Sequence, residues 1–398
     1  MRRAAIVMPL RTPVGRFLGA LKDVPAERLA AKAIEAVVTR SGVDPARIDD
    51  VVFAQSYANS EAPCIGRWAA LAANLPIEVA GMQVDRRCAG GLQAVLNAAM
   101  MVQSGAADVV MAGGVESMSN IEYYTTAMRG GARAGNVHFY DRLERGRERS
   151  QPIERFGPIS GMIETAENVA REMGVTREEA DAFAAESHRR AAAAWAEGRF
   201  ADEIVPVEVP AKKGAPVVVS QDEGVRPDTT VASLAAMKPL MAGGQVTAGN
   251  SSQQNDAAAA CLVVAEDQLD ALGLQPAGFL VGWAVAGCHP ATMGLGPVPA
   301  VAKLFARTGL SWNDIDLVEL NEAFAAQVLG VLKGWGFEDR ERLNVNGSGI
   351  SLGHPIGATG ARIVATLLHE MRRRKARYGL ETMCVGGGQG LAAVFERA

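Results

Sequence analysis

The sequence predicts an α/β protein made of two related halves, with a long segment inserted after most of the first. Short apolar stretches alternate with amphipathic helical stretches, a pattern typical of a covered and mainly parallel sheet. This alternation lapses between about residues 119 and 249 and then resumes. The chain has 398 residues, which is more than a single hydrophobic core usually serves, so two or more domains are expected.

The first half is predicted to alternate strands and helices on either side of a cysteine segment. Its expected elements are a strand over residues 4–8, a helix over 26–40, a strand over 48–54, a helix over 66–73 and a strand over 108–114. Apolar side chains at Leu29, Ala33, Ile34 and Val37 support the first helix because they recur at helical spacing.

Cys88 lies between a short strand that begins at Met82 and a helix that should end at Gly105. The apolar residues of this helix, at spacing i, i+3, i+4 and i+7, are Leu92, Val95, Leu96 and Ala99. A thiol at a helix N-terminus is surrounded by unpaired N–H groups, which lower its pKa and favour the thiolate. Cys88 is therefore a candidate nucleophile, and an inert core cysteine is the alternative.

Residues 119–249 are predicted to form an inserted subdomain over one face of the sheet. Charged residues are crowded between Asp141 and Arg155. A long helix is expected from the capping box at Thr176 to Gly198. Short strands are expected at residues 204–209 and 216–220.

The second half repeats the first. Residues 315–320 resemble residues 48–53, and residues 382–387 resemble residues 109–114. The segment that starts at residue 48 begins 40 residues before Cys88, and its counterpart that starts at residue 315 begins 39 residues before His354. We infer an internal duplication that places Cys88 and His354 at equivalent points, with chance similarity as the alternative.

Composition and charge exclude several classes of function. Apolar residues make up 48% of the chain, charged residues 21%, and the formal net charge is −4, which argues against general nucleic-acid binding. No apolar run approaches the roughly 20 residues of a membrane span, and no targeting segment is recognised, so a cytoplasmic protein is expected. The five cysteines form no CxxC pair and predict neither a disulfide framework nor a zinc site.

Three glycine-flanked or strand-end positions carry further candidate functional residues. His354 lies in a segment, residues 347–360, with five glycines, and its near-neutral pKa would suit it to accept the thiol proton of Cys88. Asn321 follows a predicted strand and either caps the next helix or points into a cleft. Cys384 ends another strand before a glycine run and is either buried or reactive.

These motifs resemble the thiolases, which interconvert a 3-ketoacyl-CoA and CoA with an acyl-CoA and acetyl-CoA. The resemblance covers essentially the whole chain. Its motifs are the cysteine segment at 88, Asn-Glu-Ala-Phe-Ala at 321–325, Gly-His-Pro-Ile-Gly-Ala-Thr-Gly at 353–360, Cys-Val-Gly-Gly-Gly-Gln-Gly at 384–390 and, as a fifth, residues 247–256. Together and in this order they identify the chain as similar to that family.

The resemblance implies a role for each candidate. Cys88 would carry the acyl group after His354 withdraws its proton, and Cys384 would exchange a proton with the acetyl methyl group. His354 and a water held by Asn321 would form one oxyanion site, and the N–H groups of Cys88 and Gly386 a second. The resemblance calls for no metal and no tightly bound cofactor, because coenzyme A is itself substrate and product.

Residues that bind the substrate also follow from the resemblance. Arg226 and Ser233 would lie beside the nucleotide of coenzyme A, with Ala248 and Ser252 along the pantetheine arm. The acyl and thioester pocket would be lined by Met162, Met293, Ala323 and Phe324. The nearby lysines, interpreted as solvated charges, are Lys212, Lys213 and Lys238.

The family fold implies three parts, an N-terminal half at residues 1–118 and 250–271, a loop domain at 119–249 and a C-terminal half at 272–398. The resemblance further implies a homodimer or homotetramer in fatty-acid or related acyl-CoA metabolism, including β-oxidation. It leaves acyl-chain length and reaction direction open.

The chain departs from the family pattern at two places. Gly90 stands where many members have serine, which would loosen the loop of the nucleophile. Residues 161–164 read Gly-Met-Ile-Glu where short-chain members often have His-Met-Gly, so the acyl pocket could have another shape. Two alternatives share the fold. One is a decarboxylating ketoacyl-synthase relative, against which Cys384 argues, and the other is a non-catalytic lipid-binding relative, against which both cysteines and His354 argue.

Overall fold

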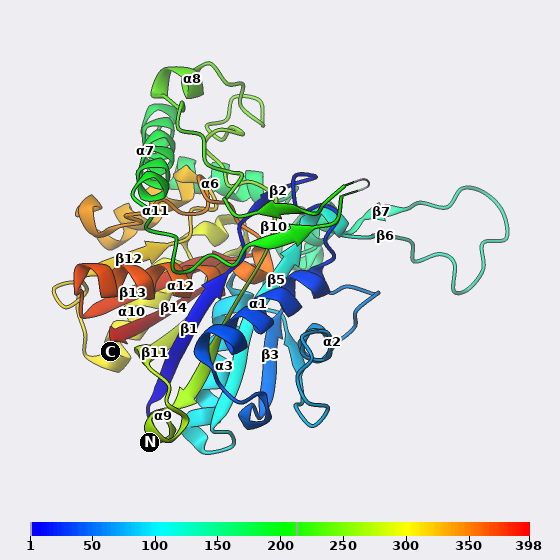
Figure 1. Cartoon of the computed structure of the whole chain (residues 1–398). Helices are drawn as coiled ribbons and strands as arrows, with labels where there is room; N and C mark the ends of the chain where they lie inside the picture. Colours follow the sequence, from blue (N-terminus) through cyan, green and yellow to red (C-terminus); the bar gives the residue numbers. More distant parts are fainter. Residues whose placement is uncertain (1, 212–213) are drawn as a thin grey trace.

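A continuous mixed sheet forms the centre of the protein. The computed structural model describes residues 2–211 and 214–398 (Figure 1). The strands follow the order β12-β13-β14-β11-β1-β10-β5-β3-β4, and β2 pairs with β10. Their bounds are β1 Ala4–Arg11, β2 Gly15–Arg16, β3 Asp50–Ala54, β4 Met82–Val84, β5 Val109–Ser117, β10 Asn255–Ala265, β11 Pro276–Gly287, β12 Leu317–Leu320, β13 Tyr378–Val385 and β14 Gln389–Arg397.

The strand order confirms the internal duplication. The first half runs β3-β5-β10-β1 across the sheet and the second runs β12-β13-β14-β11, with the same relative directions at each step. The two halves meet where β1 pairs with β11 in the antiparallel direction. Cys88 precedes α3, which leads into β5, and His354 precedes α12, which leads into the equivalent strand β13, so they occupy equivalent positions.

The expectation of a mainly parallel sheet is wrong. Among the described residues, parallel strand pairing is confined to β3 with β4 and β5, and to β12 with β13. Parallel neighbours need a long crossover, whereas β13 passes to β14 through a short glycine turn and must therefore run antiparallel to it. The equivalent pair β5 and β10 is also antiparallel, with the whole insertion between them.

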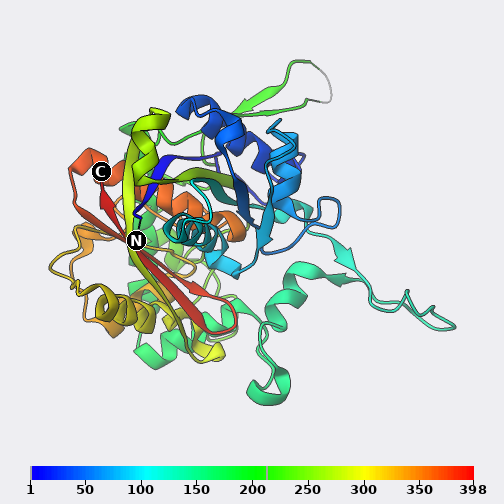
Figure 2. The same cartoon turned by 90° about the horizontal axis from the view of Figure 1, so that it is seen from below.

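Helices lie on both faces and in the middle of the fold (Figure 2). Helices α1 (Ala26–Ser41) and α2 (Ile65–Ala72) pack on the outer face of the first half, and α10 (Pro297–Thr308) and α11 (Ala325–Trp335) on that of the second. Helices α3 (Gly90–Ser104) and α12 (Ile356–Arg374) share the central core with strands of both halves. The two central helices are therefore held by strands of both halves.

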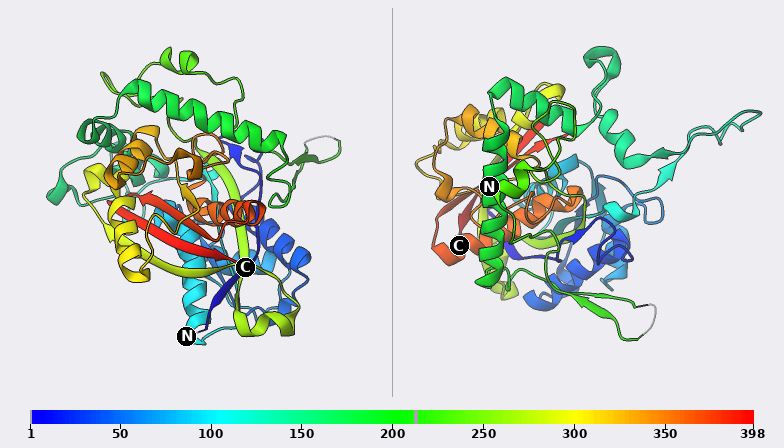
Figure 3. Two further views of the ribbon diagram at one scale, coloured as in Figure 1. Left: turned by 90° about the vertical axis from the view of Figure 1, so that its left-hand side faces the viewer. Right: turned by 90° about the horizontal axis from the view of Figure 1, so that it is seen from above.

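The insertion between β5 and β10 covers the end of the sheet where α3 and α12 begin. Its elements are β6 Tyr123–Tyr124, β7 Tyr140–Asp141, α4 Arg142–Glu148, α5 Ile153–Phe156, α6 Met162–Met173, α7 Arg177–Ala196, β8 Val207–Val209, β9 Val217–Val219 and α8 Val231–Ala235. The capping box at Thr176 is present, and α7 crosses above the sheet (Figure 3). The β6–β7 arm projects away from the rest of the molecule (Figures 1 and 2).

A buried charge cluster ties the first strand to the insertion. The guanidinium of Arg11, on β1, is fully buried and donates to Glu203 Oε1 at 2.5 Å and to both oxygens of Asp222 at 2.7 and 3.0 Å. Asp222 also accepts from the Trp195 indole N–H at 3.2 Å and from the backbone N–H of Val14 at 2.8 Å. These hydrogen bonds connect β1 to the Glu203 and Asp222 segments of the insertion.

None of the helices in the described part of the chain combines the length and the apolar character that a membrane span requires.

We expect Asp222→Ala to lower the free energy of unfolding by about 3–5 kcal/mol, because it leaves the Arg11 charge buried with one carboxylate fewer. Urea denaturation followed by circular dichroism measures the change. Asp267→Ala is the matched control, since it removes the carboxylate of an exposed ion pair with Arg2 and should leave the denaturation midpoint almost unchanged. Equal midpoints for Asp222→Ala and the unmodified protein would contradict the assignment.

Candidate active site

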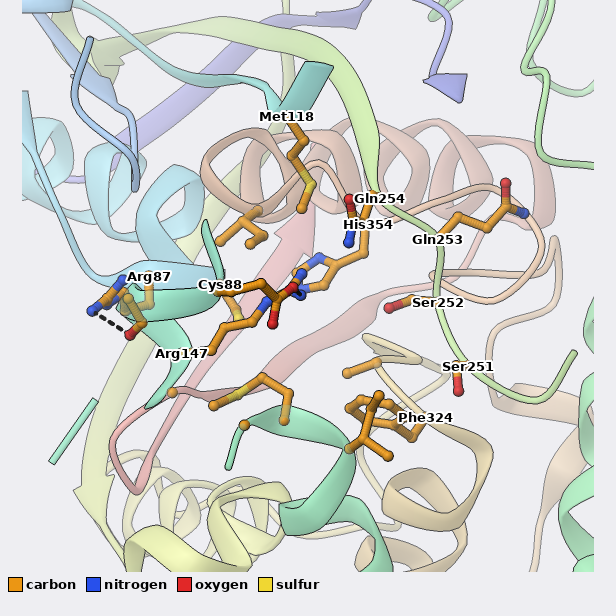
Figure 4. A pocket seen from close by; sticks show the side chains of 18 of the residues that line it. Arg87, Cys88, Met118, Arg147, Ser251, Ser252, Gln253, Gln254, Phe324 and His354 are labelled. Atoms are coloured by element: carbon orange, nitrogen blue, oxygen red, sulfur yellow. Dashed lines mark hydrogen bonds and ion pairs between the residues drawn. The ribbon is translucent and has the colours of Figure 1, made fainter. Parts of the chain in front are cut away.

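Two helix N-termini deliver a cysteine and a histidine to one cavity. Cys88 lies in the short 3-10 helix Arg87–Ala89 directly before α3, and His354 lies two residues before α12. Helices α3 and α12 contact each other along the central core. Both side chains line a cavity of about 500 Å³ (Figure 4).

Cys384 lies behind the wall of this cavity. It ends β13 and is fully buried in an apolar cluster with Met293, Ala323 and Phe324. A charge on Cys88 would raise the pKa of Cys384, and the Gly386 backbone N–H lowers the pKa of Cys88, so both groups lie near the Cys88 thiol. The structure therefore brings Cys88, Cys384 and Gly386 together although they come from different halves.

The thiols and the imidazole are all neutral near pH 7. Burial raises the pKa of Cys88, and the Gly386 N–H and the Arg87 charge offset this only in part. Burial, with the charges of Arg362 and Arg147, lowers the pKa of His354 to about 3. Burial also raises the pKa of Cys384 well above its usual value. The expected lowered pKa of Cys88 and near-neutral pKa of His354 are therefore wrong, because desolvation outweighs the helix N-terminus.

The contacts of His354 assign its tautomer. The Thr359 hydroxyl donates to Pro355 O at 3.0 Å, so its oxygen accepts the Nδ1–H of His354 at 2.7 Å. Nε2 is then left with its lone pair, and no hydrogen-bond partner for it is found among the described residues. The Asn255 side chain accepts the His354 backbone N–H at 2.8 Å and holds the loop. An unprotonated Nε2 is the atom required of a general base.

Asn321 is buried behind His354 and does not line the cavity. Its Nδ2 lies 3.5 Å from His354 Nδ1, too far for a strong hydrogen bond, and its Oδ1 has no partner among the described residues. The N-cap of α11 is Phe324, so the capping alternative for Asn321 is excluded.

The other predicted residues are divided between the cavity and the surface. Those that line the cavity are Met162, Arg226, Ala248, Ser252, Met293, Ala323 and Phe324. Ser233 is exposed, caps the first turn of α8 and is not part of the cavity wall, and Lys238 is likewise exposed and apart from it. Lys212 and Lys213 lie outside the described residues.

The sequence interpretation missed several groups at the site. Glu116 is fully buried and accepts the backbone N–H groups of Ser56, Tyr57 and Gly357, which joins the end of β5 to the His354 loop. Burial raises the pKa of Glu116 to about 7. It was overlooked because the strand was expected to end at residue 114. Arg147, from the crowded charges of residues 141–155, also lines the cavity, and the charge cluster was the signal for it.

The nucleophile loop is firmly held despite the glycine at position 90. The Ser56 hydroxyl donates to Arg87 O at 2.9 Å, beside the place where a Cβ on Gly90 would lie 3.8 Å from Ser56 Oγ. Such a Cβ would also lie 3.0 Å from the Ala54 Cβ. Ser56 thus supplies a hydroxyl next to position 90.

Family models and known proteins resemble the chain throughout. Residues 4–267 match a model described as the thiolase N-terminal domain, and residues 274–397 match the thiolase C-terminal domain. An acetyl-CoA acetyltransferase of Chromobacterium violaceum is 44% identical over 99% of both chains. A 3-oxoadipyl-CoA/3-oxo-5,6-dehydrosuberyl-CoA thiolase of Escherichia coli is 43% identical over 100% of both. The crystal structure of a Bacillus anthracis acetyl-CoA acetyltransferase has a TM-score of 0.95 at 42% identity, covering 100% of this chain and 99% of that one.

We expect Thr359→Val to lower kcat by about 10- to 100-fold, because the hydroxyl that fixes the His354 tautomer is removed. The KM for the thiol substrate should change little, since Thr359 does not line the cavity. Thr359→Ser keeps the hydroxyl and should retain most of the activity. A Thr359→Val protein with unchanged kcat, or a Thr359→Ser protein as slow as Thr359→Val, would refute the tautomer assignment.

Proposed function

This chain belongs to the thiolase family and is an acyltransferase, and on that premise we propose that Cys88, His354 and Cys384 perform the thiolase reaction around the cavity of Figure 4. The observation that supports this most is the meeting of two cysteines and one imidazole from distant parts of the chain. The presence of Cys384 at the end of β13 argues against the alternative of a decarboxylating ketoacyl synthase.

The first step acylates Cys88. Nε2 of His354 accepts the thiol proton as the sulfur attacks the C3 carbonyl of a 3-ketoacyl-CoA. Because the thiol and the imidazole are both neutral beforehand, proton transfer accompanies attack instead of preceding it. The C3 oxygen, which gains negative charge, is stabilised by the backbone N–H groups of Cys88 and Gly386.

The C2–C3 bond then breaks, and its electron pair stays on C2 of the departing acetyl-CoA. The Cys384 thiol gives its proton to C2, so the strongly raised pKa of Cys384 keeps that proton available. The enolate oxygen of the acetyl-CoA is stabilised by the new Nε2–H of His354 and by a water held by Asn321, whose Oδ1 lacks a protein partner among the described residues.

Coenzyme A completes the cycle as the second substrate. The CoA thiol gives its proton to the Cys384 thiolate, and its sulfur attacks the acyl-Cys88 carbonyl. The bond between the acyl carbon and the Cys88 sulfur then breaks, and the acyl-CoA leaves while Cys88 regains a proton from His354. We propose that Arg226, Ala248 and Ser252, which line the cavity, contact the coenzyme, and that Ser233, which is exposed outside it, contacts only the outer end of the coenzyme. No tightly bound cofactor takes part in these steps, and among the described residues no group of His, Cys, Asp and Glu is arranged to hold a metal ion.

The overall similarity to known proteins does not identify the acyl group that this chain transfers. Relatives of nearly equal identity are named as acetyl-CoA acetyltransferases or as a 3-oxoadipyl-CoA thiolase. Met162, Met293 and Phe324 form an apolar wall that suits an acyl chain. The same proposal places the enzyme in the cytoplasm and in fatty-acid or related acyl-CoA metabolism, including β-oxidation.

We further propose that the chain assembles as a homodimer or homotetramer through contacts that include the β6–β7 arm. Tyr123, Met128 and Phe139 on this arm are 65%, 55% and 68% exposed. The arm has only two strands of two residues each, and an isolated hairpin of this kind is at best marginally stable in water. A second copy of the chain that covers these side chains would account for their exposure.

We expect Cys88→Ala to abolish acyl-enzyme formation with acetyl-CoA, since the sulfur that carries the acyl group is gone. Cys384→Ala should still acylate slowly but fail to exchange the acetyl methyl protons with deuterated water. Mass spectrometry measures the first property and NMR the second. Cys64→Ala, at an exposed cysteine outside the cavity, should retain both. Methyl exchange by Cys384→Ala at the normal rate would remove Cys384 from the mechanism.

We expect the double variant Tyr123→Ser, Phe139→Ser to form a smaller assembly than the unmodified protein, because the apolar contacts of the arm are lost. Size-exclusion chromatography with light scattering gives the mass. Val218→Ser, at an exposed apolar residue on the β8–β9 hairpin, is the control and should keep the original mass. A monomeric unmodified protein at micromolar concentration would contradict the proposed assembly.

A further inference from the structure

One cationic side chain enters the mostly apolar cavity close to the nucleophile. Arg147, on α4, lines the cavity and retains only 21% exposure of its side chain. A Cβ built on Gly161, the residue before Met162, would lie 3.9 Å from the Arg147 Cβ, so α4 packs directly against the acyl wall. In Figure 4 the Arg147 side chain runs toward Cys88 and His354.

Arg147 is close to the reacting atoms. Its positive charge contributes to lowering the pKa values of both Cys88 and His354. Ser252, on the expected route of the pantetheine arm, lies on the other side of His354 in the same view (Figure 4). Arg147 lies beside Gly161 and Met162, so we assign its guanidinium to the acyl side of the thiol.

Much of the Arg147 guanidinium is free to bind a ligand. Among the described residues its side chain makes one hydrogen bond, from Nη1 to Glu144 Oε1 at 2.5 Å, and Glu144 is itself 53% exposed. Nε and Nη2 are left as donors. Arg87, the other arginine beside Cys88, is already engaged, since it donates to Gly146 O at 3.4 Å and lies over the Tyr57 ring at 5.7 Å.

We propose that Arg147 selects 3-ketoacyl-CoA substrates whose acyl chain ends in a carboxylate. This rests on the proposed thiolase function. The arginine guanidinium can bind a carboxylate through two parallel N–H···O bonds. An acyl chain that ends in a methyl group offers no such acceptor and would leave the partly desolvated guanidinium without a partner. Glu144 orients the guanidinium and weakens its charge without occupying all of its donors.

The chemistry of the reaction is unchanged by this selection. Cleavage of C2–C3 leaves the carboxyl-bearing fragment on the sulfur of Cys88, and CoA carries it away as the monothioester of a dicarboxylic acid. The terminal carboxylate is not altered at any step. Arg147 is therefore a specificity-determining residue and not a proton donor.

The test compares thiolysis of 3-oxoadipyl-CoA and 3-oxohexanoyl-CoA, which have the same chain length and differ only in a terminal carboxylate or methyl group. The unmodified protein should favour 3-oxoadipyl-CoA in kcat/KM. Arg147→Met should lower this preference by about 10- to 100-fold, the range for a hydrogen bond to a charged group. Arg147→Lys keeps the positive charge but cannot form two parallel hydrogen bonds, so its preference should lie between those of the unmodified protein and Arg147→Met.

Arg145→Met is the matched control, because Arg145 is on the same helix but lies over the Tyr140 ring at 3.6 Å and does not line the cavity. It should leave the preference unchanged. An equal preference in the unmodified protein and Arg147→Met would overturn the inference, as would a raised KM for CoA alone in Arg147→Met. If the unmodified protein cleaves 3-oxohexanoyl-CoA and 3-oxoadipyl-CoA with equal kcat/KM, only the selection by Arg147 is rejected. Turnover of neither compound by the unmodified protein rejects the proposed function as well.

Discussion

The close packing of α3 against α12 is the constraint on which the site depends. A Cβ on Gly91 would lie 2.6 Å from the Ala361 backbone N, and a Cβ on Gly360 would lie 2.2 Å from the Leu92 backbone N. No side chain larger than hydrogen fits at either place, so the two helices touch through their backbones. Because Cys88 and His354 directly precede these helices, the contact fixes the distance between the proposed nucleophile and its proposed base, which come from opposite halves.

The burial of the two central helices disfavours charged forms of the groups at their N-termini. The central helices are enclosed by both half-sheets, so the groups at their N-termini lie in a poorly solvated region where charge is costly. Neutral partners avoid that cost until a carbonyl is present to accept the negative charge. The backbone amides of Gly386 and Cys88 and the His354 imidazole, which is oriented by the Thr359 hydroxyl, need no rearrangement when that charge develops.

The insertion supplies what the duplicated halves lack. Each half can position a nucleophile or a base, but neither encloses a substrate. Residues from α4 and α6, including Arg147 and Met162, close the cavity over Cys88, and the Arg11 cluster anchors the far end of the insertion to β1. Arg147, which we propose as the side chain that selects the acyl group, belongs to the insertion and not to either repeated half.

The sequence by itself determined the two-half α/β organisation, the helix starts at Cys88 and Thr176, and the motifs around His354, Asn321 and Cys384. These are local patterns, and local periodicity and glycine placement suffice for them. Only the tertiary structure decided the antiparallel directions within the sheet, the tautomer of His354, the place of Glu116 and the reach of Arg147. It also showed that the pKa of Cys88 is raised, whereas the sequence predicted a lowered pKa. Each of these depends on which distant segments surround a group, and burial and hydrogen bonding across the chain are set by packing and not by neighbours in sequence.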